Sequence, residues 1–463
     1  MSQFKPYPVY KDSGVQWLGK VPESWTAGML RWYSTIQGGI AKGKDYEGRD
    51  TISLPYLRVA NVQDGFVDLT EIKQVSVLES ELERYSLRAG DVLMNEGGDN
   101  DKLGRGAVWQ GQIEPCLHQN HVFAIRPNDL LRSEWLAAFT GSQPARTYFF
   151  LSSKQSTNLA SISASNIMSL VVPIPPVAEQ TQVLRFLDHE TARIDALIEE
   201  QLRLIKLLKE KRKAVISHAV TKGLDPAVPM KDSGVEWLGA VPVHWDVARV
   251  KNVAKLESGH TPSKEFSEYW EGGDIPWVSL NDSKQLKVVD YIDETQFMIT
   301  ALGISNSSTR LLPARAVVFT RDATIGLAAI TTRKMCVSQH LIAWICNESI
   351  VLPEYLLFVF YAMEEELNRF TFGATLKTIG MPDVRKLVTT VPPLAEQVEI
   401  VAEVNAKREL IERLIREANT ALELHSERRS ALVSAAVTGK IDVRGWRSPA
   451  NVSSSALLEE ESV

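Results

Sequence analysis

Two long segments of the chain carry apolar residues at the spacing of an α-helix. Residues 178–219 contain no proline or glycine, and apolar side chains recur there every three or four positions from Val183 to Ile216. Residues 395–436 repeat this pattern 217 positions later. The spacing predicts two helices, each about 60 Å long at about 1.5 Å per residue and each with an apolar stripe along one side.

The blocks that precede the two helices, residues 26–172 and 246–389, alternate short apolar runs with Gly, Asn and Asp. Such runs, rich in β-branched and aromatic residues, predict short strands. We expect strands at residues 54–59, 91–94 and 121–126 in the first block and at 275–280, 316–320 and 340–345 in the second. The fold class is therefore predicted to be mixed α/β.

The chain contains an internal duplication. KDSGVQWLGKVPESW at 11–25 recurs as KDSGVEWLGAVPVHW at 231–245, and Pro-Pro-Val-Ala-Glu-Gln at 175–180 recurs as Pro-Pro-Leu-Ala-Glu-Gln at 392–397. This period is far longer than the roughly 20–50 residues of a solenoid repeat, so whole domains were duplicated. Trp17, Trp25, Trp237 and Trp245 recur with the motif, and we expect them to anchor it in hydrophobic crevices rather than to stack on bases.

The two blocks align only coarsely. We align Pro55–Val59 with Pro276–Leu280 and Gly90–Met94 with Ala314–Val318, while the loops between them have diverged. One fold with different loop tips is the interpretation that follows.

The repeat predicts five segments and one helix pair. The segments are residues 1–172 (motif and first globular block), 173–225 (first helix), 226–389 (repeated motif and second block), 390–443 (second helix) and 444–463 (a tail expected to be disordered). Because the first helix leads from one block to the other, the second helix must run back along it. We expect an antiparallel pair and a pseudo-twofold axis. The alternative is that each helix belongs to a separate core.

Composition and charge narrow the class of protein. Of 463 residues, 44% are apolar and 23% charged, which is ordinary for a soluble globular protein. A signal peptide and a membrane span are not expected, and three cysteines without ligand spacing predict neither disulfides nor zinc, so we expect a cytoplasmic protein. The net charge of −6 argues against a free-standing DNA binder, because DNA is held mainly through its phosphates.

No motif supports a catalytic reading. Residues 38–45, GGIAKGKD, match a phosphate-binding loop until Asp45 takes the place of the required Ser or Thr. The paired prolines lack the preceding Asn or Asp of an adenine methyltransferase, and the eight histidines form no metal spacing. What remains is a set of polar loops whose side chains suit base edges and phosphates. The loops are residues 95–105, 154–158, 258–264, 320–324 and 377–378.

These features together resemble the specificity subunit of a type I restriction-modification system. The resemblance rests on the two 15-residue motifs, the two Pro-Pro-x-Ala-Glu-Gln helix openings, Ser258–Ser263 ahead of Ile275–Trp277, and the Val-Val-Phe-Thr-Arg run at 317–321. It covers nearly the whole chain. One departure is that Glu96-Gly97-Gly98 in the first block stands where the second has Thr320-Arg321-Asp322, so a DNA role there cannot be copied between the halves.

The resemblance implies a DNA-binding protein that is not itself an enzyme. Two target recognition domains would each read half of a bipartite, asymmetric site on double-stranded DNA. The helices would dock two modification subunits, and the full complex would add two ATP-driven restriction subunits. S-adenosylmethionine, ATP and Mg²⁺ would bind the partners, and no cofactor or metal would bind this chain. The alternative is a DNA-modifying or nicking enzyme with its own active site; a coiled-coil scaffold is a third reading.

The candidate DNA-binding residues are chosen from loop chemistry and approximate motif position. In the first block they are Arg58, Asn61, Asn95, Asn100, Lys102, Arg105, Lys154, Gln155 and Asn158. In the second block they are His260, Thr261, Lys264, Asn281, Arg321, Thr324, Lys377 and Thr378.

Overall fold

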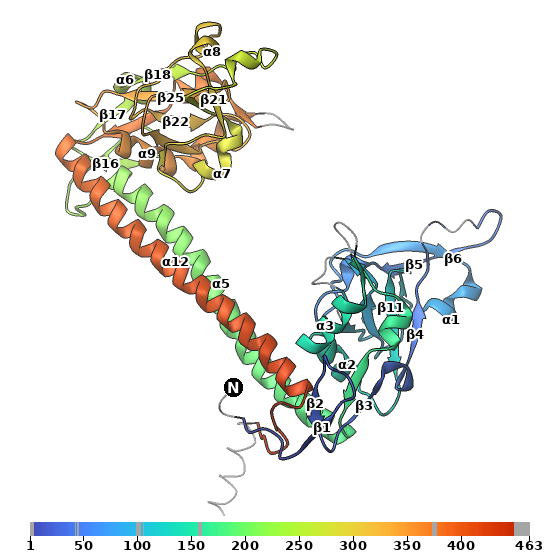
Figure 1. Cartoon of the computed structure of the whole chain (residues 1–463). Coiled ribbons are helices and arrows are strands. Elements are labelled where there is room, and N and C mark those ends of the chain that lie inside the picture. Colours follow the sequence, from blue (N-terminus) through green and yellow to red (C-terminus); the bar gives the residue numbers. More distant parts are fainter. Residues whose placement is uncertain are drawn as a thin grey trace, which may run out of the picture. The chain divides into compact units, whose positions relative to one another are not determined.

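The computed structural model describes residues 4–41, 43, 46–98, 103–104, 106–155, 160–372 and 377–448. It divides into two compact units. Unit 1 comprises Met1–Gln201 with Thr420–Val463, and unit 2 comprises Leu202–Asn419. Each unit holds one globular block together with part of each long helix (Figure 1).

The block of unit 1 is built on an antiparallel sheet. Its strand order is β4 (Ser34–Gly38), β11 (Val122–Pro127), β7 (Val92–Asn95) and β9 (Gly106–Val108). Helix α2 (Ser133–Thr140) packs on β7 and β9 through Trp135, Leu136 and Phe139. A second sheet has the order β10 (Leu117–His118), β5 (Ile52–Leu57) and β6 (Lys73–Val77). Strand β7 is central and covered on both faces, so all four of its residues are buried.

The block of unit 2 repeats this plan. Its sheet has the order β18 (Ala254–Ser258), β25 (Leu341–Cys346), β22 (Val317–Thr320), β23 (Ala328–Thr331) and β20 (Tyr291–Ile292). Helix α9 (Pro353–Ala362) packs on β22 and β23 as α2 does in unit 1. The second sheet has the order β21 (Phe297–Ile299), β19 (Ile275–Val278) and β24 (Cys336–Val337). The expected strands are thus confirmed in both blocks.

Short elements complete the two units. In unit 1 they are β1 (Tyr10–Asp12), β2 (Lys20–Pro22), β3 (Thr26–Met29), α1 (Leu82–Tyr85), β8 (Gly97–Gly98), α3 (Gln143–Ser152), β12 (Lys154–Gln155), β13 (Ala160–Ser161), α4 (Ala164–Met168) and β14 (Val171–Ile174). In unit 2 they are β15 (Met230–Asp232), β16 (Ala240–Pro242), β17 (Asp246–Arg249), α6 (Val250–Val253), α7 (Ser283–Leu286), α8 (Ala301–Ser305), α10 (Glu364–Arg369), β26 (Thr371–Phe372), β27 (Thr378–Ile379), α11 (Met381–Val384) and β28 (Val388–Val391).

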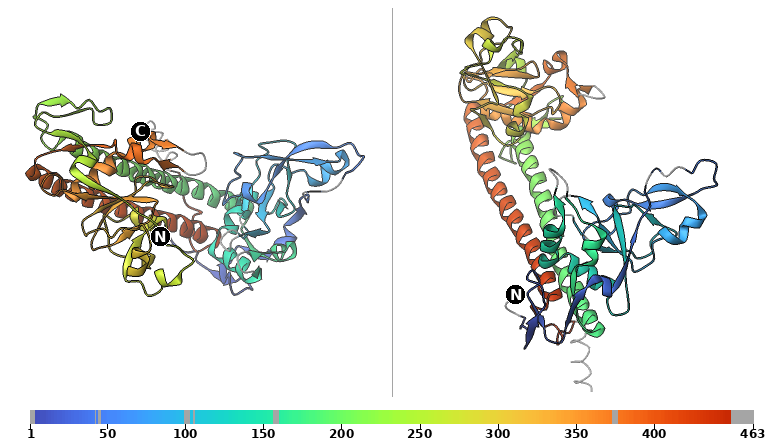
Figure 2. Two further views of the ribbon diagram at one scale, coloured as in Figure 1. Left: turned by 90° about the horizontal axis from the view of Figure 1, so that it is seen from above. Right: turned by 45° about the vertical axis from the view of Figure 1, so that its right-hand side comes forward.

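The two long helices are confirmed, as α5 (Val177–Lys222) and α12 (Leu394–Val437). In unit 1 Asp195 pairs with Arg429 at 2.6 Å, and Gln182, earlier on α5, reaches the carbonyl of Trp446 beyond the end of α12. In unit 2 Arg212 pairs with Glu412 at 3.5 Å, and a Cβ on Gly223, just beyond the end of α5, would lie 3.4 Å from Glu396 near the start of α12. Because later residues of α5 meet earlier residues of α12 in each unit, the helices are antiparallel there. They run side by side in both views of Figure 2.

The predicted apolar stripe is only partly buried. Val183 and Ile400 are fully buried at equivalent positions of the two helices, and Ile194 and Ile411 nearly so. Leu197 and its equivalent Leu414, which were expected in the same seam, are instead 45% and 39% exposed. A two-helix contact covers only one side of each helix, so the wider stripe that the sequence suggested leaves leucines on the outer surface.

The glutamine of each helix-opening motif is a buried clamp on the backbone. In unit 1 the Gln180 side chain accepts from Arg132 N at 2.9 Å and donates to the carbonyls of Leu130 and Pro175 at 2.8 and 2.9 Å. Gln397 makes the same three bonds in unit 2, to Leu352 N and the carbonyls of Ile350 and Pro392. The motif therefore recurs because it fixes the entry of each long helix to its block.

The repeated tryptophan motif is anchored as predicted. Trp25 and Trp245 are fully buried, and Trp17 and Trp237 pack against the same two cores. Glu179, in the first turn of α5, accepts hydrogen bonds from Trp25 Nε1 at 2.9 Å and from the Tyr7 hydroxyl at 2.7 Å. Burial, reinforced by this carboxylate, raises the pKa of the Tyr7 phenol.

The end of α12 returns to the N-terminal motif. Asp442 N donates to the Lys5 carbonyl at 2.8 Å, and the Tyr10 hydroxyl donates to the Gly439 carbonyl at 2.9 Å. The left-handed φ of Gly439, +72°, turns the chain there, and a Cβ at this position would lie 2.3 Å from Pro22. The segment that follows α12 therefore lies against residues near the N-terminal motif within unit 1.

One alignment of the two blocks needs correction by a single residue. The match of Pro55–Val59 to Pro276–Leu280 agrees with the strand pairing, since Tyr56 and Trp277 pair with equivalent residues, Leu117 and Cys336. In the central strands, however, Val92 corresponds to Val317, not to Ala316, because Val108 and Ile330 pair with them. Apolar strands of similar composition leave this register open in the sequence.

The corrected register changes the residue that stands opposite Glu96. Asn95 and Thr320 are the last residues of β7 and β22, so Glu96 corresponds to Arg321 and Gly97 to Asp322. The sequence alignment had placed Glu96 opposite Thr320.

Candidate functional site

In unit 1 the polar loops predicted from the sequence meet at the end of the central strand β7. Strand β12 pairs with β13, and β13 pairs with β8, so Lys154 and Gln155 share a small sheet with Gly97 and Gly98. Ile162 N also donates to the Glu96 carbonyl at 2.8 Å. The described residues of the two loops, Glu96–Gly98 and Lys154–Gln155, thus lie together although they are far apart in sequence.

Unit 2 joins the corresponding loops at the end of β22. Ile379 N donates to the Arg321 carbonyl at 3.0 Å, and Ala323 N donates to the Lys377 carbonyl at 2.9 Å. The Thr378 hydroxyl donates to Asp322 Oδ1 at 2.7 Å. Arg321, Lys377 and Thr378 therefore lie together.

A histidine–carboxylate pair lies at this place in both units. In unit 1 His121 Nδ1 is 2.6 Å from Glu96 Oε2, and in unit 2 His340 Nδ1 is 2.7 Å from Asp322 Oδ2. Each histidine directly follows an amide residue, whose nitrogen lies 3.5 Å (Asn120) or 3.3 Å (Gln339) from the histidine Nε2. An amide that donates to Nε2 requires the proton on Nδ1, so each ring donates to its carboxylate.

The backbone around these pairs is the same in the two units. Glu96 N donates to the His121 carbonyl at 2.9 Å, and Arg321 N donates to the His340 carbonyl at 3.0 Å. The backbone arrangement that the two units share carries different side chains, Glu96 in unit 1 and Arg321 in unit 2. An acceptor and a donor placed on the same frame can read different bases.

In each unit a glycine lets a further loop approach the segment just before the histidine of the histidine–carboxylate pair. A Cβ on Gly39 would lie 2.1 Å from the His118 carbonyl, and one on Gly259 would lie 2.0 Å from the Val337 carbonyl. Only glycine permits such a close approach. Packing therefore accounts for Gly39, and a nucleotide-binding role is not needed to explain it. In unit 2 the two residues after Gly259 also contact this segment. His260 N donates to the Val337 carbonyl at 3.1 Å, and the Thr261 hydroxyl contacts the Gln339 side chain.

Two candidate residues are buried and hold the scaffold. The Asn61 side chain accepts from Arg58 N at 2.9 Å and donates to the carbonyls of Asp68 and Glu71. Asn95, 2% exposed, donates to the Val62 carbonyl at 3.2 Å. Both side-chain amides form hydrogen bonds with backbone atoms, so they stabilise the backbone that carries the polar loops. Arg58 lies 3.6 Å from Glu71 and remains partly exposed.

The remaining candidates divide into exposed and undescribed residues. Lys154, Gln155, His260, Lys264, Asn281, Thr324 and Lys377 are exposed. Among the residues that the structure describes, Lys264 and Asn281 form no hydrogen bond or ion pair with Arg321, Asp322, His340 or Thr378. The Thr324 carbonyl accepts a hydrogen bond from the hydroxyl of Thr320, the residue before Arg321, at 2.5 Å. Asn100, Lys102, Arg105 and Asn158 lie outside the described residues.

Sequence reasoning did not select the two histidines or the amides beside them. His118 to His121 reads HQNH and Val337 to His340 reads VSQH, so both copies place an amide and a histidine just before a strand. An alignment of the halves in the corrected register would have revealed them. His118 itself is fully buried, and burial lowers its pKa.

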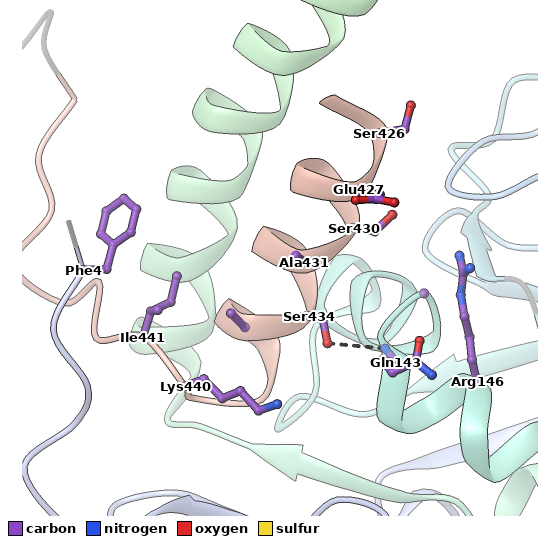
Figure 3. Close-up of a pocket in the computed structure, with 12 residues that line it drawn as sticks. Phe4, Gln143, Arg146, Ser426, Glu427, Ser430, Ala431, Ser434, Lys440 and Ile441 are labelled. Atoms are coloured by element: carbon purple, nitrogen blue, oxygen red, sulfur yellow. Dashed lines mark hydrogen bonds between the residues drawn. The ribbon is translucent and has the colours of Figure 1, made fainter. Parts of the chain in front are cut away.

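A groove in unit 1 involves none of the candidate residues. It has a volume of about 760 Å³ and lies between α3 and the end of α12. Ser426, Ser430 and Ser434 line one side, and Gln143 N donates to Ser434 Oγ at 3.3 Å (Figure 3). The described residues include no group of three or more side chains suited to a metal ion, and none of their helices is apolar over a membrane-spanning length.

Comparison with protein families identifies the repeated unit. The family model described as "Type I restriction modification DNA specificity domain" matches the chain twice, at residues 35–207 and 242–420.

Several curated proteins resemble the chain over nearly its full length. The putative type I restriction enzyme MjaX specificity subunit of Methanocaldococcus jannaschii is 24% identical over 444 residues, which cover 92% of this chain and 96% of that protein. The type I restriction enzyme EcoKI specificity subunit of Escherichia coli K12 is 24% identical over 471 residues, which cover 96% of each chain.

Two solved structures share the fold. A chain from a structural study of complex assembly and conformational transition of a type I R-M system matches with a TM-score of 0.70 and 17% identity, covering 91% of this chain and 99% of that one. The HsdS subunit from Thermoanaerobacter tengcongensis matches with a TM-score of 0.53 and 16% identity, covering 91% and 98%.

Proposed function

The chain belongs to the family defined by the type I restriction-modification DNA specificity domain, and from this we propose that it is the sequence-reading subunit of such a system. Each unit would contact one half of a bipartite site on double-stranded DNA. The observation that carries the proposal is the duplicated scaffold: the same backbone frame at the ends of β7 and β22 presents Glu96 in one unit and Arg321 in the other. Two copies of one frame with different side chains suit two unlike half-sites.

The exposed candidates then have distinct roles. Arg321, Gln155 and the amides Asn120 and Gln339 suit base edges, while lysines such as Lys154 and Lys377 suit phosphates. Asn61 and Asn95 hold the scaffold. Asn100, Lys102, Arg105 and Asn158 remain candidates on the same loops.

Methylation and cleavage belong, in this proposal, to partner subunits. Leucines remain exposed along both helices, and exposed apolar side chains of this kind suit a docking surface. They are Leu197, Leu202, Leu204 and Leu207 on α5, and Leu410, Leu414 and Leu424 on α12. We infer that these helices dock two modification subunits, which bind S-adenosylmethionine, and that two restriction subunits with ATP and Mg²⁺ complete the complex. Partners that clamp the phosphates also account for a DNA-reading chain with a net charge of −6.

The decisive experiment maps methylated adenines genome-wide in cells that express the chain with its modification subunits. The expected result is a non-palindromic motif of two short half-sites with an unread spacer. A continuous or palindromic motif would contradict the model. The alternative, an enzyme with its own active site, predicts turnover when the purified chain is incubated with DNA and S-adenosylmethionine or ATP, and we expect none.

A second test separates phosphate contacts from base contacts. Lys154→Ala should weaken binding to all DNA sequences alike and reduce the salt dependence of log K by about 0.9, the value for one phosphate contact. Lys20→Ala, which removes an exposed lysine of β2 in the same unit, is the matched control. If both variants behave alike, Lys154 does not contact the backbone of DNA.

A further inference from the structure

We propose that Glu96 and Arg321 are corresponding specificity-determining residues, with Glu96 accepting a hydrogen bond from a cytosine amino group in the first half-site and Arg321 donating to a guanine in the second. The inference rests on the proposed function. Its basis is that two side chains of opposite charge occupy one backbone position in a duplicated scaffold, each just beyond the central strand.

The Glu96 carboxylate is oriented but not saturated. His121 holds Oε2 at 2.6 Å, and Oε1 accepts no hydrogen bond from any described residue. The side chain is 32% exposed. DNA phosphates repel a carboxylate, so on a DNA-facing surface it is stable only where it meets a donor. In the major groove the cytosine N4 amino group is the donor that a carboxylate suits.

Arg321 is a cation whose hydrogen-bonding capacity is almost unused. Its guanidinium donates no hydrogen bond to a described residue, its Nε is buried without a partner, and the nearest carboxylate oxygen, on Asp322, is 3.6 Å away. A half-buried guanidinium with unpaired donors costs free energy unless a ligand supplies acceptors. Guanine N7 and O6 offer two acceptors that match the guanidinium fork.

The neighbouring carboxylate explains why Arg321 remains available. Asp322 has one oxygen bonded by His340 at 2.7 Å and the other by Thr378 at 2.7 Å. Each Asp322 oxygen thus already accepts one hydrogen bond, and Arg321 Nε lies 3.6 Å from Oδ1, beyond hydrogen-bonding distance, so the two side chains form no bidentate pair. In unit 1 the histidine instead binds Glu96, and Gly97 stands where unit 2 has Asp322. In unit 2 the carboxylate that binds the histidine thus stands one residue later than in unit 1, and the position of Glu96 is occupied by the positively charged Arg321.

The histidines are then positioning residues. His121 fixes the direction of the Glu96 carboxylate, and His340 fixes Asp322 beside Arg321. Removing His121 should lower discrimination at the base that Glu96 reads while leaving binding to other positions intact, because a side chain released from its support samples several rotamers.

The test uses the full chain with its modification subunits and a library of methylation targets. Glu96→Gln should change one position of the first half-site only. The preference for cytosine there should fall roughly 10- to 100-fold, because a glutamine amide can also form hydrogen bonds with adenine. Arg321→Gln should lower the preference for guanine at one position of the second half-site by a similar factor. His121→Ala should reproduce part of the Glu96→Gln effect at the same base pair.

Two controls separate the possible outcomes. Glu83→Gln and Lys334→Gln change exposed charges of the same units and should leave the motif unaltered. The inference is overturned if Glu96→Gln and Arg321→Gln leave both half-sites unchanged, or if each weakens both half-sites equally while the unfolding of the variants matches wild type. If the wild-type chain directs no methylation at any bipartite motif, the proposed function itself fails, and that result is distinguishable from the other two.

Discussion

Replacing Gln180 by leucine tests whether the helix-opening motif fixes the first long helix to its block. Leucine is close to glutamine in volume but cannot form the three hydrogen bonds that the amide makes. The Pro175 carbonyl bond is fully buried, whereas the bonds to Arg132 N and the Leu130 carbonyl are partly buried. An unsatisfied buried group costs about 1–3 kcal/mol, and a partly hydrated one about 0.5–1 kcal/mol. The expected destabilisation of unit 1 is therefore about 2–5 kcal/mol.

A chain of two units need not unfold in a single step, so the assay must report on each unit. Hydrogen exchange with mass spectrometry gives local opening free energies for peptides of α2, β14 and the first turns of α5. Gln180→Leu should lower protection there and leave the block of unit 2 unchanged, while Gln397→Leu should do the reverse. The control is Gln16→Leu, an exposed glutamine of unit 1 expected to change stability by less than about 0.5 kcal/mol.

The reasoning is refuted if Gln180→Leu loses no more protection than Gln16→Leu. It is also refuted if Gln180→Leu destabilises both blocks equally, because the clamp would then not be local to the junction that it spans.

Three further predictions follow from the helices, the termini and the cysteines. Inserting one heptad after Arg203 and one after Thr420 should lengthen the helix pair by about 10 Å and the spacer of the methylated motif by about 3 base pairs, with unchanged half-sites; an unchanged spacer with retained activity would mean that the modification subunits set the distance. A circular permutant that joins the old termini through a flexible linker and opens between Pro226 and Met230 should fold and direct methylation, because Asp442 already binds Lys5; failure to fold would contradict it. Burial raises the pKa of the thiols of Cys116, Cys336 and Cys346 to about 12 from the ordinary value of 9.0, so the thiols should react slowly with iodoacetamide at pH 8 and quickly in urea. Because the pKa of each thiol is higher in the folded than in the unfolded protein, the contribution of the buried neutral thiols to the stability of the fold is complete below pH 9 and is lost as the pH rises toward 12. Labelling of the native protein as fast as in urea would refute the burial of the thiols.

The sequence by itself determined the large-scale plan of this protein. Helical periodicity is a local property, so the two long helices could be placed to within a few residues of α5 and α12. The duplicated motifs marked two equivalent blocks, and their order along the chain required the helices to run in opposite directions. The alternation of apolar runs with turn residues located the principal strands of both blocks.

Only the tertiary structure decided the register and the partners of polar groups. Val92 could align with Ala316 or Val317 because both are apolar, and only the cross-strand pairing distinguished them. Likewise, nothing local separates a loop asparagine that faces solvent from Asn61, whose amide is buried against the backbone. Leu197 and Leu414 fit the apolar stripe yet lie on its outer side. Burial and hydrogen bonding depend on residues distant in sequence, and a one-residue shift reverses which face a side chain occupies. The backbone position that Glu96 and Arg321 share was therefore decided only by the folded structure.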